Sequence, residues 1–432
     1  MTPDLDRLFA LSRRGTDVAT ELRAGATTFL AMAYIAFVNP QILAEAGIPF
    51  GAAFAATCLA AAFSTLVMGL YANLPVALAP GMGLNAFFAY VVVLELGHPW
   101  EVALGAVFIA GVLFVVLSVL PVRRWIVDAV PTGLKMGIAA GIGLFLGLIA
   151  LRNAGIVRES ATTLVTAGDL LAPAPVLAFL GFCATVALAA RRVPGAALVG
   201  VLGVMAAGVG LGVSEWHGVV APPPDPTPTL LAMDVAGALQ IAMIGVIVTF
   251  LIVDFFDTTG TLIGVARQAN LLDAEGRLPR FGRAVLADSS GTVAGAMLGT
   301  SPVTSYVESA AGTSAGGRTG LTACVVAALF VACLFFAPLA QSIPPYATAP
   351  AILYVACLMT RGLADVDWRD VTESSAAAVT ALAIPLTFSI ADGIGIGVLA
   401  YVAASAMAGR IRDCSPVLVA VALLFALKFA LL

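Results

Sequence analysis

Two carboxylates close a long apolar run in the middle of the chain, in the stretch TFLIVDFFDTTGT (Thr249–Thr261). On a helix Asp254 and Asp257 share one face, and Thr258, four residues after Asp254, lies on it too. An ionisable side chain at bilayer depth costs several kcal/mol, so it usually faces a cavity or a partner and has a function. This stretch therefore predicts one wall of a binding site, where a carboxylate binds a ligand or takes up a proton.

Two structural roles compete with this interpretation: the carboxylates could neutralise buried arginines, or they could cap a broken helix. No arginine lies inside any of the long apolar runs of the sequence. This disfavours the first role, because a buried charge needs an opposite charge or a hydrogen-bond partner beside it. The capping role stays open.

Two further segments are short and interrupted by proline and glycine. LAPGMGLNAFFAY carries Pro80, Gly83 and Asn85, and GTSPVTSYVESAAGTSAGG carries Pro302 and Glu308. Such segments, in corresponding positions of the two halves of a membrane protein, point to a binding site near the midplane that is formed by discontinuous helices. Glu308 is the strongest candidate, because a lone buried carboxylate needs a partner or a proton.

The neighbouring residues have structural alternatives. Gly83 could serve close helix packing, Asn85 could bond only to another helix, and Phe87 could pack instead of stacking on a ligand. Asp288, in LADSSGT, could cap a helix, and we assign it no ligand role. Carboxylates, an amide and hydroxyls suit a neutral ligand rich in N–H groups, or a cation, and they repel anions.

The composition places these residues in a membrane. Of the 432 residues, 61% are hydrophobic and 11% are charged, with a mean hydropathy of +1.04, whereas soluble domains have about 25% charged residues. The net charge of −4 and the lack of a polybasic run argue against nucleic acid as a partner. The six cysteines have no metal-binding spacing. We expect a single integral membrane domain over residues 1–432, in contact with lipid, without metal or cofactor.

Fourteen apolar runs are long enough to cross about 30 Å of hydrocarbon, or half of it in broken pairs. They are Ala24–Val38, Gly51–Tyr71, Val76–Leu94, Val102–Leu120, Gly133–Leu151, Pro175–Ala190, Pro194–Gly212, Val235–Asp257, Ala284–Leu298, Pro302–Gly312, Leu321–Leu339, Ala347–Met359, Ser375–Ile390 and Gly393–Ala408. A further apolar stretch, Pro416–Leu432, could be another span or an interfacial helix. The expected fold class is an all-α polytopic membrane protein with discontinuous third and tenth spans.

Arginine placement predicts the orientation, because cytoplasmic connections are rich in Lys and Arg. If the N-terminus is inside, the outer connections hold only Arg152 and Arg158. The inner connections then hold Arg123, Arg124, Arg191, Arg192, Arg267, Arg277, Arg280, Arg283, Arg318, Arg361, Arg369, Arg410 and Arg412. We therefore expect a multi-pass protein with a cytoplasmic N-terminus and a cytoplasmic connection over Thr258–Arg283.

A proline-rich connection, APPPDPTPT at 221–229, divides the chain into two halves of seven runs. An odd number of spans per half makes related halves face opposite ways, as in inverted repeats. We predict such repeats over residues 24–213 and 235–408, with 416–432 outside both. An offset of 223 residues places Tyr34 at the position of Asp257 and Asn85 at that of Glu308, so polar residues of the two halves fall at equivalent depth.

Four blocks of the chain resemble the AzgA-like purine permeases, a branch of the nucleobase–cation symporters. They are RAGATTFLAMAYIAFVNPQIL, ALAPGMGLNAFFAY, DFFDTTGTLIGVA and LADSSGTVAGAMLGTSPVTSYVESAAGTSAGGRTGLTA. The resemblance covers nearly the whole chain. It implies proton-coupled import of adenine, guanine or hypoxanthine across a bacterial plasma membrane by alternating access. It also implies two inverted repeats, with spans one to four and eight to eleven as a core domain and the others as a gate domain.

The resemblance also implies roles for individual residues, because Asn85, Asp254 and Glu308 match the family's substrate and coupling residues. The expected substrate-binding residues are Glu308, Asn85, Asp254, Thr258, Gly83, Phe87 and Thr304, and the expected proton-coupling residues are Asp254, Asp257 and Glu308. A proton is the expected coupling ion, and sodium stays open. Relatives of this fold are often dimers, so a homodimer is compatible with the resemblance.

Three alternatives remain. A transporter of uracil or xanthine is disfavoured, because those branches usually have Gln-His where this chain has Asn85-Ala86. An anion transporter of the same fold requires a cavity without net negative charge. An intramembrane aspartyl protease needs two aspartates as acid and base, expected on adjacent spans, whereas Asp254 and Asp257 lie on one. We therefore expect a transporter and no enzyme.

Overall fold

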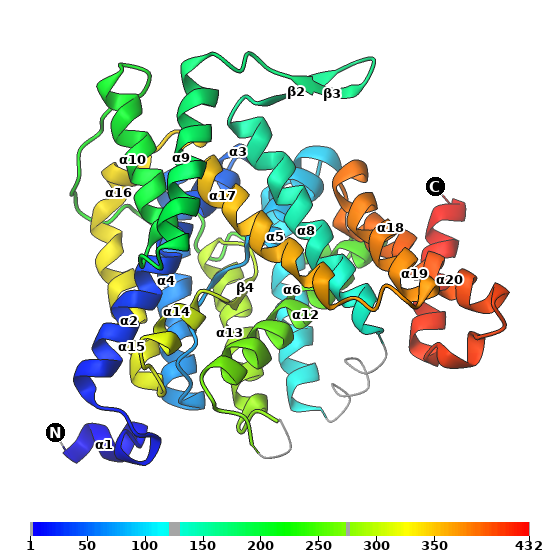
Figure 1. The fold of residues 1–432 in the computed structure, drawn as a ribbon, viewed down its shortest axis with the longest axis horizontal. Helices are drawn as coiled ribbons and strands as arrows, with labels where there is room; N and C mark the ends of the chain where they lie inside the picture. The colour runs from blue at the N-terminus through cyan, green and yellow to red at the C-terminus, as the bar shows by residue number, and fades with distance from the viewer. Residues whose placement is uncertain (1–2, 121–129, 274–276, 432) are drawn as a thin grey trace. The chain divides into compact units, whose positions relative to one another are not determined.

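The computed structural model describes residues 3–120, 130–273 and 277–431, most of which are helical (Figure 1). Within these ranges nine helices are long and apolar enough to cross a membrane, and four shorter apolar helices accompany them. The expected helical multi-pass fold is confirmed, and the count of fourteen spans stays a prediction. The chain divides into two compact units, Met1–Val119 with Ala154–Ile156 and Ala167–Ala351, and Leu120–Asn153 with Val157–Thr166 and Ile352–Leu432.

The first unit contains all the polar segments singled out above. Its elements are α1 (Pro3–Phe9), α2 (Val18–Met32), α3 (Ile35–Glu45), α4 (Phe50–Val67), β1 (Leu78–Pro80), α5 (Met82–Ala86), α6 (Trp100–Val119), α9 (Pro173–Ala190), α10 (Ala196–Gly210), α11 (Val235–Ala238), α12 (Ile244–Gln268), α13 (Phe281–Leu298), β4 (Val303–Ser305), α14 (Ser309–Ser314), α15 (Gly320–Cys333) and α16 (Ala337–Gln341). Helix α13 packs against α4 and α6, and α15 packs against α2 and α4. Helices α9 and α10, the sixth and seventh predicted spans, belong to this unit, where α10 packs against α2, and the gate role that the resemblance implies for them stays a prediction.

The third and tenth apolar runs each begin as a short strand and continue as a helix. Strand β1 pairs antiparallel with β4, with Leu78 opposite Ser305 and Pro80 opposite Val303, and α5 and α14 follow the two strands. The all-α expectation did not include these strands, nor the hairpin of β2 (Val157–Ser160) and β3 (Leu164–Ala167). Proline explains the break in both runs, because it lacks the N–H of a helix interior and pushes the preceding residue into an extended conformation.

The helix that carries the two aspartates extends farther than its apolar run predicts. Helix α12 continues to Gln268, so the expected connection over Thr258–Arg283 was wrong in its first part. Leu262 and Val265 continue the buried face of α12 beyond the polar Thr-Thr-Gly stretch, which explains why the helix persists. The first span is also longer, Val18–Glu45, and it breaks at Ala33 and Tyr34 between α2 and α3.

The second unit is held together by small residues. It contains α8 (Thr132–Asn153), the greater part of α17 (Pro345–Thr360), α18 (Val371–Thr387), α19 (Ile390–Met407) and α20 (Pro416–Leu431). Gly137 and Gly141 of α8 face α18, and a Cβ on Gly137 would lie 2.6 Å from the carbonyl oxygen of Ala377. Such close backbone contact is how helices associate in membranes, where small residues replace hydrophobic burial as the basis of packing.

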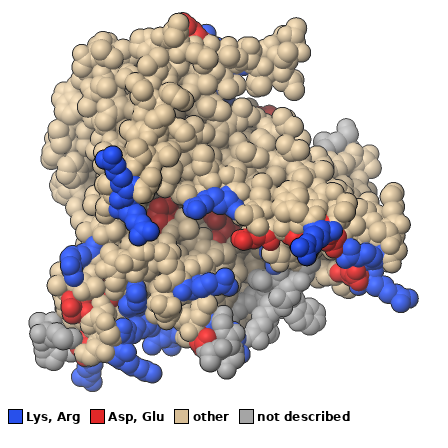
Figure 2. Space-filling model, in the orientation of Figure 1, with Lys and Arg blue, Asp and Glu red and all other residues tan. Residues whose placement is uncertain are grey.

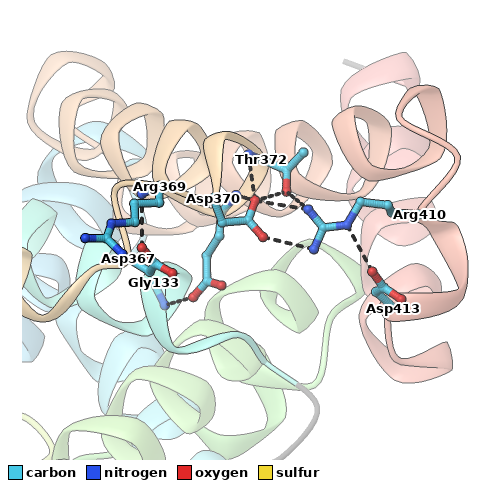
Figure 3. A network of polar contacts seen from close by, with 8 residues as sticks. Gly133, Asp367, Arg369, Asp370, Thr372, Arg410 and Asp413 are labelled. Carbon is cyan, nitrogen blue, oxygen red and sulfur yellow. Dashed lines mark hydrogen bonds and ion pairs between the residues drawn. The ribbon is translucent and has the colours of Figure 1, made fainter.

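A polar network fixes the N-terminus of α18 in this unit (Figure 3). Asp370 caps the helix, accepting from the backbone N–H of Thr372 at 3.0 Å, and its other oxygen accepts from Arg410 Nη2 at 2.9 Å. Glu373, in the first turn of α18, accepts a hydrogen bond from the backbone N–H of Gly133 on α8. The hydrogen bonds from Arg410 hold the pKa of Asp370 well below its usual value.

The C-terminal stretch, whose placement the sequence left open, forms helix α20 as far as Leu431. It lies against α19, where Phe425 fills the space that a side chain on Gly395 would need. Lys428 Nζ also contacts Asp392 Oδ1 at 2.6 Å. Leu432 lies outside the described residues.

The surface in Figure 2 is largely free of charge, and around the α1 end of the first unit Lys and Arg side chains gather. The positive-inside rule makes this the expected cytoplasmic end. Arg123 and Arg124, two of the predicted inner arginines, lie outside the described residues. The orientation stays a prediction.

Candidate functional site

Helix α12 presents its predicted polar face to α13 and β4. Asp254, which is 2% exposed, accepts a hydrogen bond from Thr292 Oγ1 of α13 at 2.9 Å. One turn later Thr258, which is fully buried, donates to Asp288 Oδ1 of α13 at 2.7 Å. Asp257 stands at the exposed edge of the same face. The structure therefore brings together on one face the residues that the spacing predicted.

The paired strands form the opposite wall of this polar region. Gly81 donates from its N–H to the carbonyl oxygen of Pro302 at 2.9 Å, and Tyr306 donates from its hydroxyl to the carbonyl oxygen of Pro80 at 2.5 Å. A Cβ on Gly81 would lie 2.8 Å from Thr304 Cγ2, so the approach of the two segments requires glycine there. These hydrogen bonds satisfy backbone N–H and C=O groups that have no intrahelical partner, because the two segments are extended before α5 and α14 begin.

Glu308 immediately precedes α14 and is only partly buried. Its Oε1 accepts a hydrogen bond from the hydroxyl of Tyr34 at 2.6 Å. Tyr34 reaches it from the break between α2 and α3, which joins the first and tenth predicted spans. Tyr34 is therefore the side chain that holds this carboxylate.

Asn85 lies deeper, with no exposed surface. Its Nδ2 donates to Asn39 Oδ1 at 2.9 Å, and Asn39 in turn donates to Thr57 and to Thr300. Within the described part of the chain, Asn85 Oδ1 has no hydrogen-bond partner. Buried polar atoms are normally paired, so this unpaired oxygen is unusual, and it has no exposed surface in this structure.

The remaining predicted site residues differ in how they are placed. Thr304, 2% exposed, lies in β4 with its Oγ1 3.0 Å from Thr258 Oγ1 and 3.4 Å from Asp257 Oδ2. Gly83 is partly exposed in α5. Phe87 is 1% exposed and packs edge-on against Phe250, with ring centroids 5.0 Å apart, so its ring is occupied by core packing.

Sequence reasoning underrated Asp288, which has no exposed surface and accepts hydrogen bonds from Thr258 and from Ser305 Oγ at 2.8 Å. It also did not find the bond between Tyr34 and Glu308. One signal existed for Tyr34, because the offset between the halves aligned it with Asp257. For Asp288 the signal was a carboxylate inside the run Ala284–Leu298, close to the end that was expected at the cytoplasmic edge of the membrane.

The site is rich in acceptors. Asp254 and Asp288 are close enough to interact through their charges, as are Asp257 and Glu308. Within the ranges that the structure describes, no group of three or more His, Cys, Asp or Glu side chains is arranged to hold a metal ion. Four carboxylates with hydroxyl partners suit an N–H-rich ligand or a proton and disfavour an anion.

Comparison with known proteins agrees with this chemistry. Residues 19–427 match the Permease family. The chain belongs to this family. Adenine permease AdeP of Escherichia coli is 47% identical to this permease over 98% of its chain and 95% of the relative, and guanine/hypoxanthine permease PbuO of Bacillus subtilis is 41% identical over 98% and 100%. The resemblance to purine permeases is confirmed. By its family the permease is a nucleobase transporter, and the protease alternative was wrong.

Among solved structures, the permease is similar to the transmembrane domain of the cyanobacterial bicarbonate transporter BicA. The TM-score is 0.66 at 16% identity, over 88% of this chain and 97% of that one. At this identity the likeness concerns the fold alone. The permease therefore shares its architecture with that transporter and its sequence with purine permeases.

Proposed function

We propose that the permease imports purine nucleobases by proton-coupled symport, with adenine as the first substrate to test and guanine and hypoxanthine as the others. The relatives support this, since the adenine permease is 47% identical and the guanine/hypoxanthine permease 41% identical. The observation that carries the proposal is the arrangement of acceptors around β1 and β4. Glu308 and Asp257 are accessible, and Asp254 and Asp288 are sealed behind them.

In this mechanism Glu308 accepts hydrogen bonds from purine N–H groups, and Tyr34 holds its carboxylate in place. Asn85 and the backbone at the start of α5 and α14 orient the ring. Asp254 and Asp257 take up the transported proton, because a carboxylate close to other carboxylates favours its neutral form, and burial adds to this effect at Asp254. Alternating access then follows from a shift between inward-facing and outward-facing states.

Uptake of radiolabelled adenine into proteoliposomes with an alkaline interior tests the proposal. We expect accumulation that a protonophore abolishes and that unlabelled guanine or hypoxanthine reduces, while uracil and xanthine do not compete. A parallel series with a sodium gradient and no pH gradient tests the coupling ion. Accumulation in the sodium series alone would replace the proton by sodium, and competition by uracil but not by purines would overturn the substrate assignment.

A further inference from the structure

We propose that Thr258 and Thr304 form a proton bridge between Asp257 and Asp288, so that these two carboxylates share one proton during transport. The inference rests on the proposed proton-coupled function. Three contacts define the bridge: Asp257 Oδ2 to Thr304 Oγ1 at 3.4 Å, Thr304 Oγ1 to Thr258 Oγ1 at 3.0 Å, and Thr258 Oγ1 to Asp288 Oδ1 at 2.7 Å.

The number of hydrogens decides which state this bridge describes. Three oxygen–oxygen contacts need three hydrogens, and the two threonines supply one each, since a hydroxyl has a single O–H and an ionised carboxylate has none. If both carboxylates are ionised, Thr304 can donate its single hydrogen either to Asp257 or to Thr258, but not to both. Donating to Asp257 leaves the contact between the hydroxyls without a hydrogen, and donating to Thr258 leaves Asp257 without a donor. One carboxyl proton completes all three bonds.

A second observation points to the same shortage of hydrogens. Asp254 Oδ1 is buried beside the bridge and has no hydrogen-bond partner among the described residues. Its other oxygen accepts from Thr292. Because buried carboxylate oxygens are normally paired, the cluster has more acceptors than the protein's own donors can satisfy. A transported proton supplies what is missing.

The bridge also runs from an accessible group to a sealed one. Asp257 is exposed, whereas Thr304 is 2% exposed, and Thr258 and Asp288 have no exposed surface. A proton taken up by Asp257 passes to Thr304 Oγ1, the Thr304 proton passes to Thr258 Oγ1, and the Thr258 proton passes to Asp288 Oδ1. One proton moves inward, each hydroxyl is restored, and no water is needed.

The surroundings keep the proton within this pair. The ionisable groups that face it within the described ranges are Asp254 on α12, Glu308 before α14 and the phenol of Tyr306 after β4. The charges of Asp254 and Glu308 disfavour two negative charges on the pair Asp257 and Asp288. One proton shared by this pair is therefore favoured over none. Thr258 and Thr304, which the sequence predicted as substrate ligands, in this scheme pass the proton between the two carboxylates.

The test compares Thr258→Val with Thr258→Ser and with Thr259→Val. Valine keeps the shape of threonine and removes the hydroxyl, and serine keeps the hydroxyl. Thr259 is a matched control on the same helix, buried, with an Oγ1 that has no partner among the described residues. Each variant is assayed in proteoliposomes for adenine accumulation under a pH gradient and for adenine exchange at equal pH, which needs no net proton movement.

We expect Thr258→Val to lose about tenfold in accumulation, the effect of one charge-assisted hydrogen bond, and to keep exchange at the level of the control. Thr258→Ser should restore accumulation. Equal accumulation in Thr258→Val and the wild type would overturn the bridge, and so would loss of exchange together with accumulation, which would make Thr258 a substrate ligand.

Asp288→Asn tests the bridge independently if the valine variant does not reach the membrane. Asparagine donates permanently to Thr258 through Nδ2 and accepts from Ser305 through Oδ1, which imitates the protonated state. We expect exchange that no longer varies with pH, and no accumulation. Accumulation by Asp288→Asn would refute the bridge. Failure of the wild type itself to accumulate adenine under the pH gradient would refute the proposed function instead.

Discussion

Replacing Glu308 by glutamine should weaken purine binding and leave the fold intact. Glutamine keeps an oxygen that can accept the hydroxyl of Tyr34, so the 2.6 Å contact persists. It removes the negative charge, and with its oxygen bound to Tyr34 the group that faces the ligand is an NH2, which can only donate. A hydrogen bond to a charged group contributes about 1.5–3 kcal/mol. The substitution therefore costs about 1.5–3 kcal/mol for each purine N–H that Glu308 binds.

One such bond predicts binding weaker by about tenfold or more, and two predict a loss of about a hundredfold or more. Competition of unlabelled adenine against bound radiolabelled adenine, with detergent-solubilised protein, measures this directly. Glu215→Gln is the matched control, since it is the same chemical change at a side chain that is 91% exposed and distant in sequence from the site. Unchanged adenine affinity in a Glu308→Gln variant that unfolds at the wild-type temperature would show that Glu308 is not a ligand.

Three further substitutions test the coupling and the packing. Asp254→Asn should abolish accumulation against a gradient and flatten its dependence on pH; retention of both in the uptake assay would remove Asp254 from the proton role. Gly137→Val forces its side chain into the backbone of α18, and we expect a loss of about 1–3 kcal/mol in thermal unfolding, with no loss for Gly203→Val, whose Cβ meets no atom within 4 Å. Asp370→Ala should cost about 0.5–2 kcal/mol as a lost helix cap. Because Arg410 depresses the pKa of Asp370, this contribution is present at neutral pH and should disappear as acid protonates the carboxyl; an equal loss at all pH values would contradict it.

The helices were predictable because composition alone determines which segments can lie in a membrane, and the clustering of Asp254 and Thr258 followed from helical spacing. The strands were not. β1 and β4 are three residues long, too short for an alternating pattern, and each is stabilised by pairing with a segment of the other half. Pro80 and Pro302 indicated that the helices break, but the antiparallel pair exists only once the two halves meet.

The partners of the site residues were hidden for a related reason. Tyr34 and Glu308 are 274 positions apart, and a tyrosine in an apolar run carries no mark of its partner. Asp288 was given no ligand role, because it lies near the expected cytoplasmic start of its run, at Ala284, where a carboxylate could cap a helix. In the structure α13 begins at Phe281, which places Asp288 within the helix and beside α12. The position of Asp288 in its run therefore did not show that Thr258 and Ser305 would surround it.

The fold of this permease is shared with a bicarbonate transporter at 16% identity, so the fold cannot choose between an anion and a purine. The side chains that this fold carries near β1 and β4 distinguish the two kinds of ligand. A bicarbonate or sulfate ion in contact with Asp257 and Glu308 would face two carboxylates, with Asp254 and Asp288 behind them, and like charges at such distances repel by several kcal/mol in a desolvated site. A neutral base with N–H donors meets acceptors instead. In the proposed mechanism, selectivity therefore depends on which side chains surround the β1 and β4 pair, and the carboxylates that would repel an anion would also hold the transported proton.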